Sequence, residues 1–238
     1  MKLHPLASKL HKWLALIVGV QLMLWTASGL FMTIFPIAEV RGEHLVNEVP
    51  DLKLDRPFIM PDFDREPVTG LALRMIGERP VLVVDHPTRR MMHDPYTGDM
   101  IPPPDATGIT ELASQIYAGE DRIEAIELIE RDPPSEWRGP LPVWQVRYDG
   151  ADRLRLYFDA DTGELLTRRT RLWRVYDFMW MLHIMDYDSR EDFNNPLVQA
   201  AAGLGLSVAL SGLLLVVYRT LKPWFARRRR VKARKAAI

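Results

Sequence analysis

The chain has 238 residues, with 31 basic and 31 acidic side chains, so its formal net charge is zero. It contains no cysteine, which excludes disulfides, thiol redox chemistry, iron–sulfur clusters and cysteine-based zinc sites. The charges are segregated along the chain. All 31 acidic residues and 19 of the basic ones lie within residues 39–192, which carry a formal charge of −12.

Two stretches without any charged residue, 13–38 and 193–218, lie on either side of this acidic segment. A membrane-spanning helix needs about 20 mostly apolar residues, so we predict transmembrane helices at 13–36 and 195–218. The second has a clear start signal, because Asn195 suits the N-cap and Pro196 the first helical position. A cleaved signal peptide is the alternative for the first, but its apolar run would be only about 7–15 residues.

The basic residues outside the acidic segment predict how the chain is oriented in the membrane. Three lysines lie in residues 1–12, and nine lysines and arginines lie in 219–238. By the positive-inside rule, both termini are expected in the cytoplasm and the middle segment outside it. The tail "RRRRVKARK" directly follows a span, so we expect it to contact anionic lipid rather than nucleic acid.

The middle segment contains one pattern twice, in Pro80–Met100 and in Pro142–Leu165. Each copy has a strand-like run, a turn, a second strand and then the motif Asp-x-x-Thr-Gly-acid-apolar. In both motifs, the glycine permits a tight turn. The second copy is preceded by an amphipathic helix, 108–117, and a strand, 122–131, whereas the first lacks an equivalent helix.

These elements predict an α+β domain with antiparallel sheets of about three strands and at least one packed helix. The expected divisions are a linker at 37–67, a first, degenerate unit at 68–104, a second unit at 105–170 and an aromatic-rich helix at 171–190. In the second span, small residues recur every four positions, as in Ala201, Gly205 and Ala209, and this spacing favours close helix packing.

Four stretches carry a family resemblance: "HKWLALIVGVQLMLWTASGL", "VWQVRYDGADRLRLYFDADTGELL", "WMLHIMDYD" and "LSVALSGLLLVVYR". They resemble the PepSY-associated transmembrane proteins. The resemblance implies a bacterial inner-membrane protein with a periplasmic PepSY domain. Together with the elements above, it predicts an α+β PepSY-like domain of two antiparallel hairpin-containing units between two transmembrane helices. Longer relatives in this family have four spans and are associated with siderophore-iron uptake and haem-dependent reduction, whereas other PepSY domains inhibit or chaperone peptidases. This chain departs from the longer relatives by having only two predicted spans, so a four-helix haem site would require a dimer.

Two histidines are candidate haem b ligands, because imidazole is a good iron ligand. His11 lies at the predicted cytoplasmic edge of the first span, and His183 precedes the second. They are expected near opposite faces of a hydrocarbon core about 30 Å thick, so one chain cannot clamp one haem between them. A two-fold homodimer would pair each histidine with its own copy. The alternatives are an interfacial His11 and a His183 that is simply polar on an amphipathic surface helix.

His86 and His93 lie near the first hairpin and form a weaker candidate metal site, because each has a neighbouring aspartate. With a turn at residues 87–90, the cross-strand partners are expected to be His86 with Met91 and Val84 with His93. The alternative is that both histidines are exposed hairpin residues.

Two functions of different classes follow. The first is haem-linked electron transfer across the membrane, in support of periplasmic ferric-iron or siderophore reduction. The second is a non-catalytic module that binds or restrains a periplasmic protein or a membrane complex. The chain shows no serine–histidine–acid set and no phosphate-binding loop, so a hydrolase is not expected.

Overall fold

The computed structural model describes residues 3–61 and 67–216, with the side chains of residues 13–61 and 67–213. The chain forms two compact units. One contains residues up to Ile34 together with those from Asp177 onward, and the other runs from Phe35 to Tyr176. We call them the membrane unit and the sheet unit and describe each separately.

The membrane unit consists mainly of two long helices, α1 (Leu3–Ile34) and α5 (Pro196–Val216). Their stretches Trp13–Ile34 and Pro196–Leu213 are long and apolar enough to cross a bilayer. The predicted start of α5 is confirmed, because the backbone N–H of Val198 donates to the Asn195 side-chain oxygen at 2.9 Å. Helix α4 (Arg171–Ile184) begins in the sheet unit and ends in the membrane unit.

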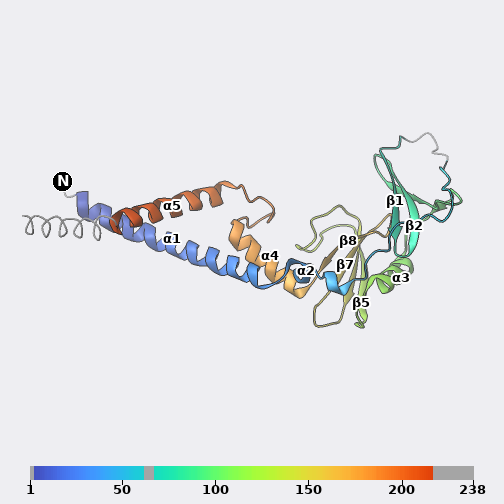
Figure 1. Cartoon of the computed structure of the whole chain (residues 1–238), viewed down its shortest axis with the longest axis horizontal. Coiled ribbons are helices and arrows are strands. Elements are labelled where there is room, and N and C mark those ends of the chain that lie inside the picture. Colours follow the sequence, from blue (N-terminus) through green and yellow to red (C-terminus); the bar gives the residue numbers. More distant parts are fainter. Residues whose placement is uncertain (1–2, 62–66, 217–238) are drawn as a thin grey trace, which may run out of the picture. The chain divides into compact units, whose positions relative to one another are not determined.

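Helices α1 and α5 pack closely at a small residue, as the four-residue spacing predicts (Figure 1). Gly205 is buried, and a Cβ atom placed on it would lie 3.9 Å from Val18. Ala209 is exposed, as is Gly203, where an added Cβ would meet nothing within 4 Å. Only part of the small-residue pattern therefore serves contact within this chain.

The sheet unit contains two antiparallel four-stranded meanders, ordered β1-β2-β3-β4 and β5-β6-β7-β8 (Figure 1). The strands of the first are β1 (Gly70–Ile76), β2 (Arg79–Asp85), β3 (Arg90–His93) and β4 (Met100–Ile101). The strands of the second are β5 (Ile123–Ile129), β6 (Val143–Tyr148), β7 (Arg155–Asp159) and β8 (Leu165–Arg169). The short helices α2 (Ile37–Val40) and η1 (Glu43–Leu45) precede them.

The repeated Asp-x-x-Thr-Gly motif forms the same turn in both sheets. Asp94 accepts hydrogen bonds from the backbone of Tyr96 and Thr97, and Asp159 accepts them from Asp161 and Thr162 at 3.0 and 2.9 Å. The glycine of each motif has a positive φ, 78° at Gly98 and 71° at Gly163. The internal repeat predicted from sequence is therefore present in three dimensions.

Helix α3 (Ala106–Ile116) is shared by the two sheets. Its Ile109 and Ala113 are fully buried against β6 and β7, while Leu112 packs on the buried residues of the first sheet as well. The apolar face predicted for this helix is confirmed, and its N-cap is Asp105, which accepts from the Gly108 N–H at 2.9 Å. Because α3 covers both sheets, the first unit needs no helix of its own.

Two expectations for the first sheet are wrong. The first sheet has four strands instead of about three, because β1 joins β2 through a two-residue turn at Gly77 and Glu78. The hairpin register differs by two residues: Val84 pairs with Met91, and His93 pairs with Leu82. The turn is tighter than expected, since the His86 N–H bonds to the Arg89 carbonyl at 2.9 Å.

Candidate functional site

The clearest polar contact inside the membrane unit joins α1 to α4. The hydroxyl oxygen of Ser28 is 3.0 Å from Nδ1 of His183, and Ser28 is only 1% exposed. The same hydroxyl is 2.7 Å from the Leu24 carbonyl oxygen, one turn earlier in α1. Because the hydroxyl has one proton and the carbonyl can only accept, the short contact to Leu24 favours a serine that donates to Leu24 and accepts the Nδ1–H of His183.

This assignment puts the His183 proton on Nδ1. With the proton on Nδ1, the lone pair of the neutral ring is on Nε2. Nε2 makes no hydrogen bond to any residue in the described part of the chain. A histidine whose Nδ1–H is held by a neighbouring oxygen is the usual state of a metal-ligating imidazole.

Gly29 provides the space for the His183 ring. A Cβ atom placed on Gly29 would lie 3.3 Å from Cε1 of His183, closer than ordinary van der Waals contact. The ring therefore packs on the bare backbone of α1. Two stretches of sequence more than 150 positions apart, Ser28-Gly29 and Leu182-His183, thus form one contact, although the sequence pattern alone did not predict that they meet.

The contact lies within the apolar span. Ser28 is six residues before Ile34, which corresponds to about 9 Å along α1. His11 is seventeen residues from Ser28, or about 26 Å along the same helix. The two candidate ligands are therefore far apart within one chain, which agrees with the sequence-based geometry. The side chain of His11 lies outside the described residues.

Further polar contacts hold the end of α4, which stops at Ile184 and not at the predicted residue 190. Asp177, which is 6% exposed, forms an ion pair with Arg190. The Trp180 indole N–H donates to the Arg190 carbonyl at 3.0 Å, and the Asn195 side-chain amide donates to the Ile184 carbonyl at 3.0 Å. The Asp177–Arg190 pair was not predicted from the sequence, although an acidic residue within an apolar helix was a signal for it.

The loop after α4 is organised around Asp186. Its carboxylate accepts hydrogen bonds from the Ser189 hydroxyl at 2.5 Å and from the backbone N–H groups of Glu191 and Asp192, both at 3.0 Å. These donors, Ser189 first, hold the pKa of Asp186 well below its usual range. The loop that joins α4 to α5 is thus fixed by its own side chains.

The observed strand pairing does not place the two hairpin histidines opposite each other, because His93 pairs with Leu82. His93 lies in β3 and is 8% exposed, so the alternative that both are exposed hairpin residues is wrong for it. Its Nδ1 is 3.1 Å from the Gly98 carbonyl, while Nδ1 of His86 is 3.2 Å from that of Pro67. No group of three histidine, aspartate or glutamate side chains suited to a metal occurs in the described part of the chain. The metal site at His86 and His93 stays a prediction.

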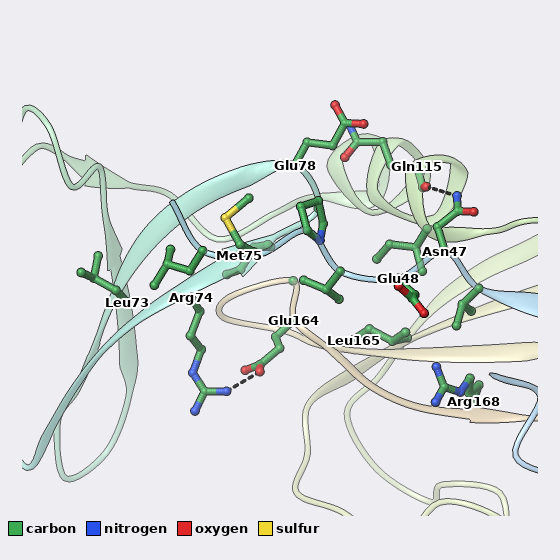
Figure 2. Close-up of a pocket in the computed structure, with 18 residues that line it drawn as sticks. Asn47, Glu48, Leu73, Arg74, Met75, Glu78, Gln115, Glu164, Leu165 and Arg168 are labelled. Atoms are coloured by element: carbon green, nitrogen blue, oxygen red, sulfur yellow. Dashed lines mark hydrogen bonds and ion pairs between the residues drawn. The ribbon is translucent and has the colours of Figure 1, made fainter. Parts of the chain in front are cut away.

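The sheet unit has a groove of about 660 Å³ between its two sheets (Figure 2). Strand β1 with the Gly77 turn lines one side, and β8 lines the other. Arg74 of β1 and Glu164 at the start of β8 point toward each other and form an ion pair across the groove. Residues 46–52 and the end of α3 complete the lining, tied together by the Asn47 amide, which donates to the Gln115 carbonyl at 2.9 Å.

A buried carboxylate lies on the opposite face of the second sheet from α3. Glu136 accepts hydrogen bonds from Arg155 at 2.9 Å, Arg174 at 3.2 Å and the Tyr157 hydroxyl at 2.7 Å. Trp137 stacks on the Tyr157 ring with their centroids 5.0 Å apart. With every partner supplied by the protein itself, this network is a structural anchor of the sheet unit.

An α+β domain with an internal repeat, linked to two bilayer-length apolar helices, defines a class of membrane-anchored proteins. Comparison with family models identifies which one: residues 8–237 match the PepSY-associated TM region. The match covers nearly the whole chain, so the chain belongs to this family and is a membrane protein with a PepSY domain. Searches of curated proteins and of solved structures found no match.

Proposed function

We propose that this chain is the membrane subunit of a haem-linked electron-transfer system, with His183 as an axial ligand. The observation that carries the proposal is the hydrogen bond between Ser28 and His183, which leaves Nε2 as the basic nitrogen. Bound haem would supply reversible one-electron chemistry. The role of Ser28 is to hold the ring orientation and the Nδ1 proton, and that of Gly29 is to let the ring approach α1.

The second axial ligand of the haem bound by His183 would come from a second copy of the chain. The described residues near His183 include no other histidine, and His11 is about 26 Å away along α1. A two-fold dimer brings each His183 to its own copy and each His11 to its own copy, which gives two haem levels. We place the chain in a bacterial inner membrane with both termini cytoplasmic and the PepSY domain periplasmic, where ferric iron or a siderophore complex is the acceptor.

Haem titration of the purified full-length protein tests this proposal. Each dimer is expected to bind two haems, one between its two His183 side chains and one between its two His11 side chains. His183→Ala is expected to remove the first of these haems. His44→Ala is the matched control, because His44 is exposed in the sheet unit. Identical haem binding by His183→Ala and the unaltered protein would contradict the assignment.

A second function is favoured by the groove of the sheet unit. Both β1 and β8 are edge strands of the described sheets, so each has unpaired backbone groups along one side. An extended polypeptide can add to such an edge through main-chain hydrogen bonds. Under this alternative, the PepSY domain binds or restrains a periplasmic protein, with the groove as its binding site.

Crosslinking from the groove tests the alternative. A photoreactive residue at Leu73, which lines the groove, is expected to capture a periplasmic polypeptide, and one at Leu128 in β5, which does not line it, is the control. Equal capture from both positions would argue against a specific groove partner.

A further inference from the structure

A second polar feature of the membrane unit is a pair of side chains near the middle of α1. Gln21 and Trp25 lie one turn apart, and each has a nitrogen that is fully buried: Nε2 of Gln21 and Nε1 of Trp25. Among the described residues, neither nitrogen has a hydrogen-bond partner. A buried donor without an acceptor is unfavourable, and more so in a bilayer, where water is absent.

Turning the Gln21 amide does not remove the deficit. The amide carries two N–H donors and one carbonyl oxygen, and the indole carries one further donor. One oxygen with two lone pairs on the same amide cannot accept from its own nitrogen. Even if it accepts the indole N–H, the amide N–H groups stay without a partner. The site therefore requires an acceptor from outside these two side chains.

Both side chains line a cavity of about 220 Å³ in the membrane unit. The rest of its wall is apolar and comes from α1, from α5 and from Met185 after α4, including Leu22, Leu204 and the buried Gly205. This volume is below the roughly 300–1,000 Å³ of pockets that enclose a drug-sized ligand, so it suits one ring with its substituents. An apolar wall with few polar partners is unfavourable for ordered water.

The depth of Gln21 in the bilayer limits which molecules can occupy the cavity. Gln21 is eight residues from Trp13, the start of the span, and thirteen from its end at Ile34, so it lies about 12 Å and 20 Å from the two ends. This is close to the middle of a core about 30 Å thick, away from the lipid ester groups at the interface. Both nitrogens are buried, so an acceptor reaches them only from within the cavity that the two side chains line, where a single ring fits and a helix of a second copy does not.

We infer that this cavity binds the ring of a membrane-soluble quinone, whose carbonyl oxygens accept hydrogen bonds from Gln21 and Trp25. The ring fills the cavity between α1 and α5, and the isoprenoid tail lies along the exposed apolar surface of the helices. The site is separate from His183, so it stands whether or not haem binds there.

Binding of decylubiquinone to the full-length protein in nanodiscs tests the inference, with bound quinone counted above protein-free discs. Saturable binding of one quinone per chain is expected, weakened at least tenfold by Gln21→Leu and by Trp25→Phe. Thr26→Val is the matched control, because Thr26 is exposed on the same helix and bonds only to the Leu22 carbonyl. His183→Ala is expected to leave quinone binding unchanged, which separates this site from the proposed haem site.

Two results would overturn the inference. One is the absence of saturable binding, or equal binding by Gln21→Leu and Thr26→Val. The other is a protein that is less stable in discs of ether lipid, which lacks ester carbonyls, than in discs of ester lipid, and that added quinone does not stabilise. That result would show that lipid ester groups are the acceptor.

Discussion

The Ser28 hydroxyl lies 3.0 Å from Nδ1 of His183 and 2.7 Å from the Leu24 carbonyl of its own helix, which favours an Nδ1–H on the histidine. This relationship ties α4 to the first span and defines which histidine nitrogen is available to a ligand. Removal of a hydrogen-bond partner behind a metal-ligating histidine typically lowers metal affinity 10–100-fold. The same range is the expectation for the serine here.

Ser28→Ala is therefore expected to weaken haem binding about 10–100-fold without abolishing it, because the ring stays but its Nδ1 proton loses its acceptor. Thr26→Val is the control, since Thr26 makes the same type of bond to its own helix but is exposed and does not contact His183. Haem titration of both variants measures the effect. Equal affinities for the two variants would show that Ser28 does not orient the ring.

Gly29→Val is expected to displace the His183 ring, because a Cβ at this position would already lie 3.3 Å from Cε1. Gly19→Val is the matched control on the same helix, where an added Cβ meets nothing within 4 Å. Nitrogen NMR of isotope-labelled histidine reports the tautomer directly and needs no haem. We expect the Nδ1–H signature in the Gly19 variant and its loss in the Gly29 variant; retention in both would contradict the packing argument.

The two repeated turns offer an internal comparison of glycine substitutions. Alanine at a positive φ costs about 1–2 kcal/mol, and both Gly98 and Gly163 have such a φ. A Cβ on Gly163 would also lie 2.7 Å from Leu112 of α3, whereas on Gly98 the nearest atom would be 3.5 Å away. Gly163→Ala is therefore expected to destabilise the protein more than Gly98→Ala, as measured by chemical denaturation; the reverse order would refute the contact with α3.

Loss of the buried carboxylate of Glu136 is expected to destabilise the sheet unit strongly. Glu136→Ala leaves Arg155 and Arg174 without their acceptor, and breaking a buried pair in this way costs about 3–5 kcal/mol. The control is Glu124→Ala, since Glu124 is exposed and lies 4.0 Å from Arg147, a pair worth about 1 kcal/mol at most. Chemical denaturation followed by circular dichroism measures both, and similar losses would show that Glu136 is not an anchor.

Alkaline pH is expected to destabilise the sheet unit. Burial, followed by a hydrogen bond to Asp121, raises the pKa of Tyr117 to about 12, and burial raises the pKa of Tyr148 and of Tyr157 further. The unfolded chain deprotonates these tyrosines near pH 10 and the folded chain does not, so stability is intact below about pH 10 and falls as the pH rises above it. Tyrosinate absorbance recorded during a pH titration should therefore rise together with unfolding; ionisation of all tyrosines near pH 10 in the folded protein would contradict this.

Much of the fold was predictable because the signals are local. The apolar face of α3, the N-cap at Asn195 and the Asp-x-x-Thr-Gly turns each depend on residues within a few positions of one another. Strand β1 was missed, although its two-residue turn begins with glycine, a common hairpin signal. The hairpin register was off by two because it depends on how tightly the chain turns after Asp85.

The candidate site was predictable only in part. His183 was a candidate ligand because it is a histidine close to a predicted span. The sequence pattern does not show that Ser28 and Gly29 lie against the His183 ring. The same holds for the Asp177–Arg190 pair and for the unpartnered nitrogens of Gln21 and Trp25, which depend on tertiary contacts. Pairings between distant segments arise from helix packing, and periodicity in the sequence carries no information on them.

The absorption spectrum of the full-length protein, purified from haem-replete cells, tests the central proposal most directly. We expect a Soret band that changes on reduction, is diminished in His183→Ala and is unchanged in His44→Ala. A protein that purifies folded but shows no Soret absorbance would contradict it.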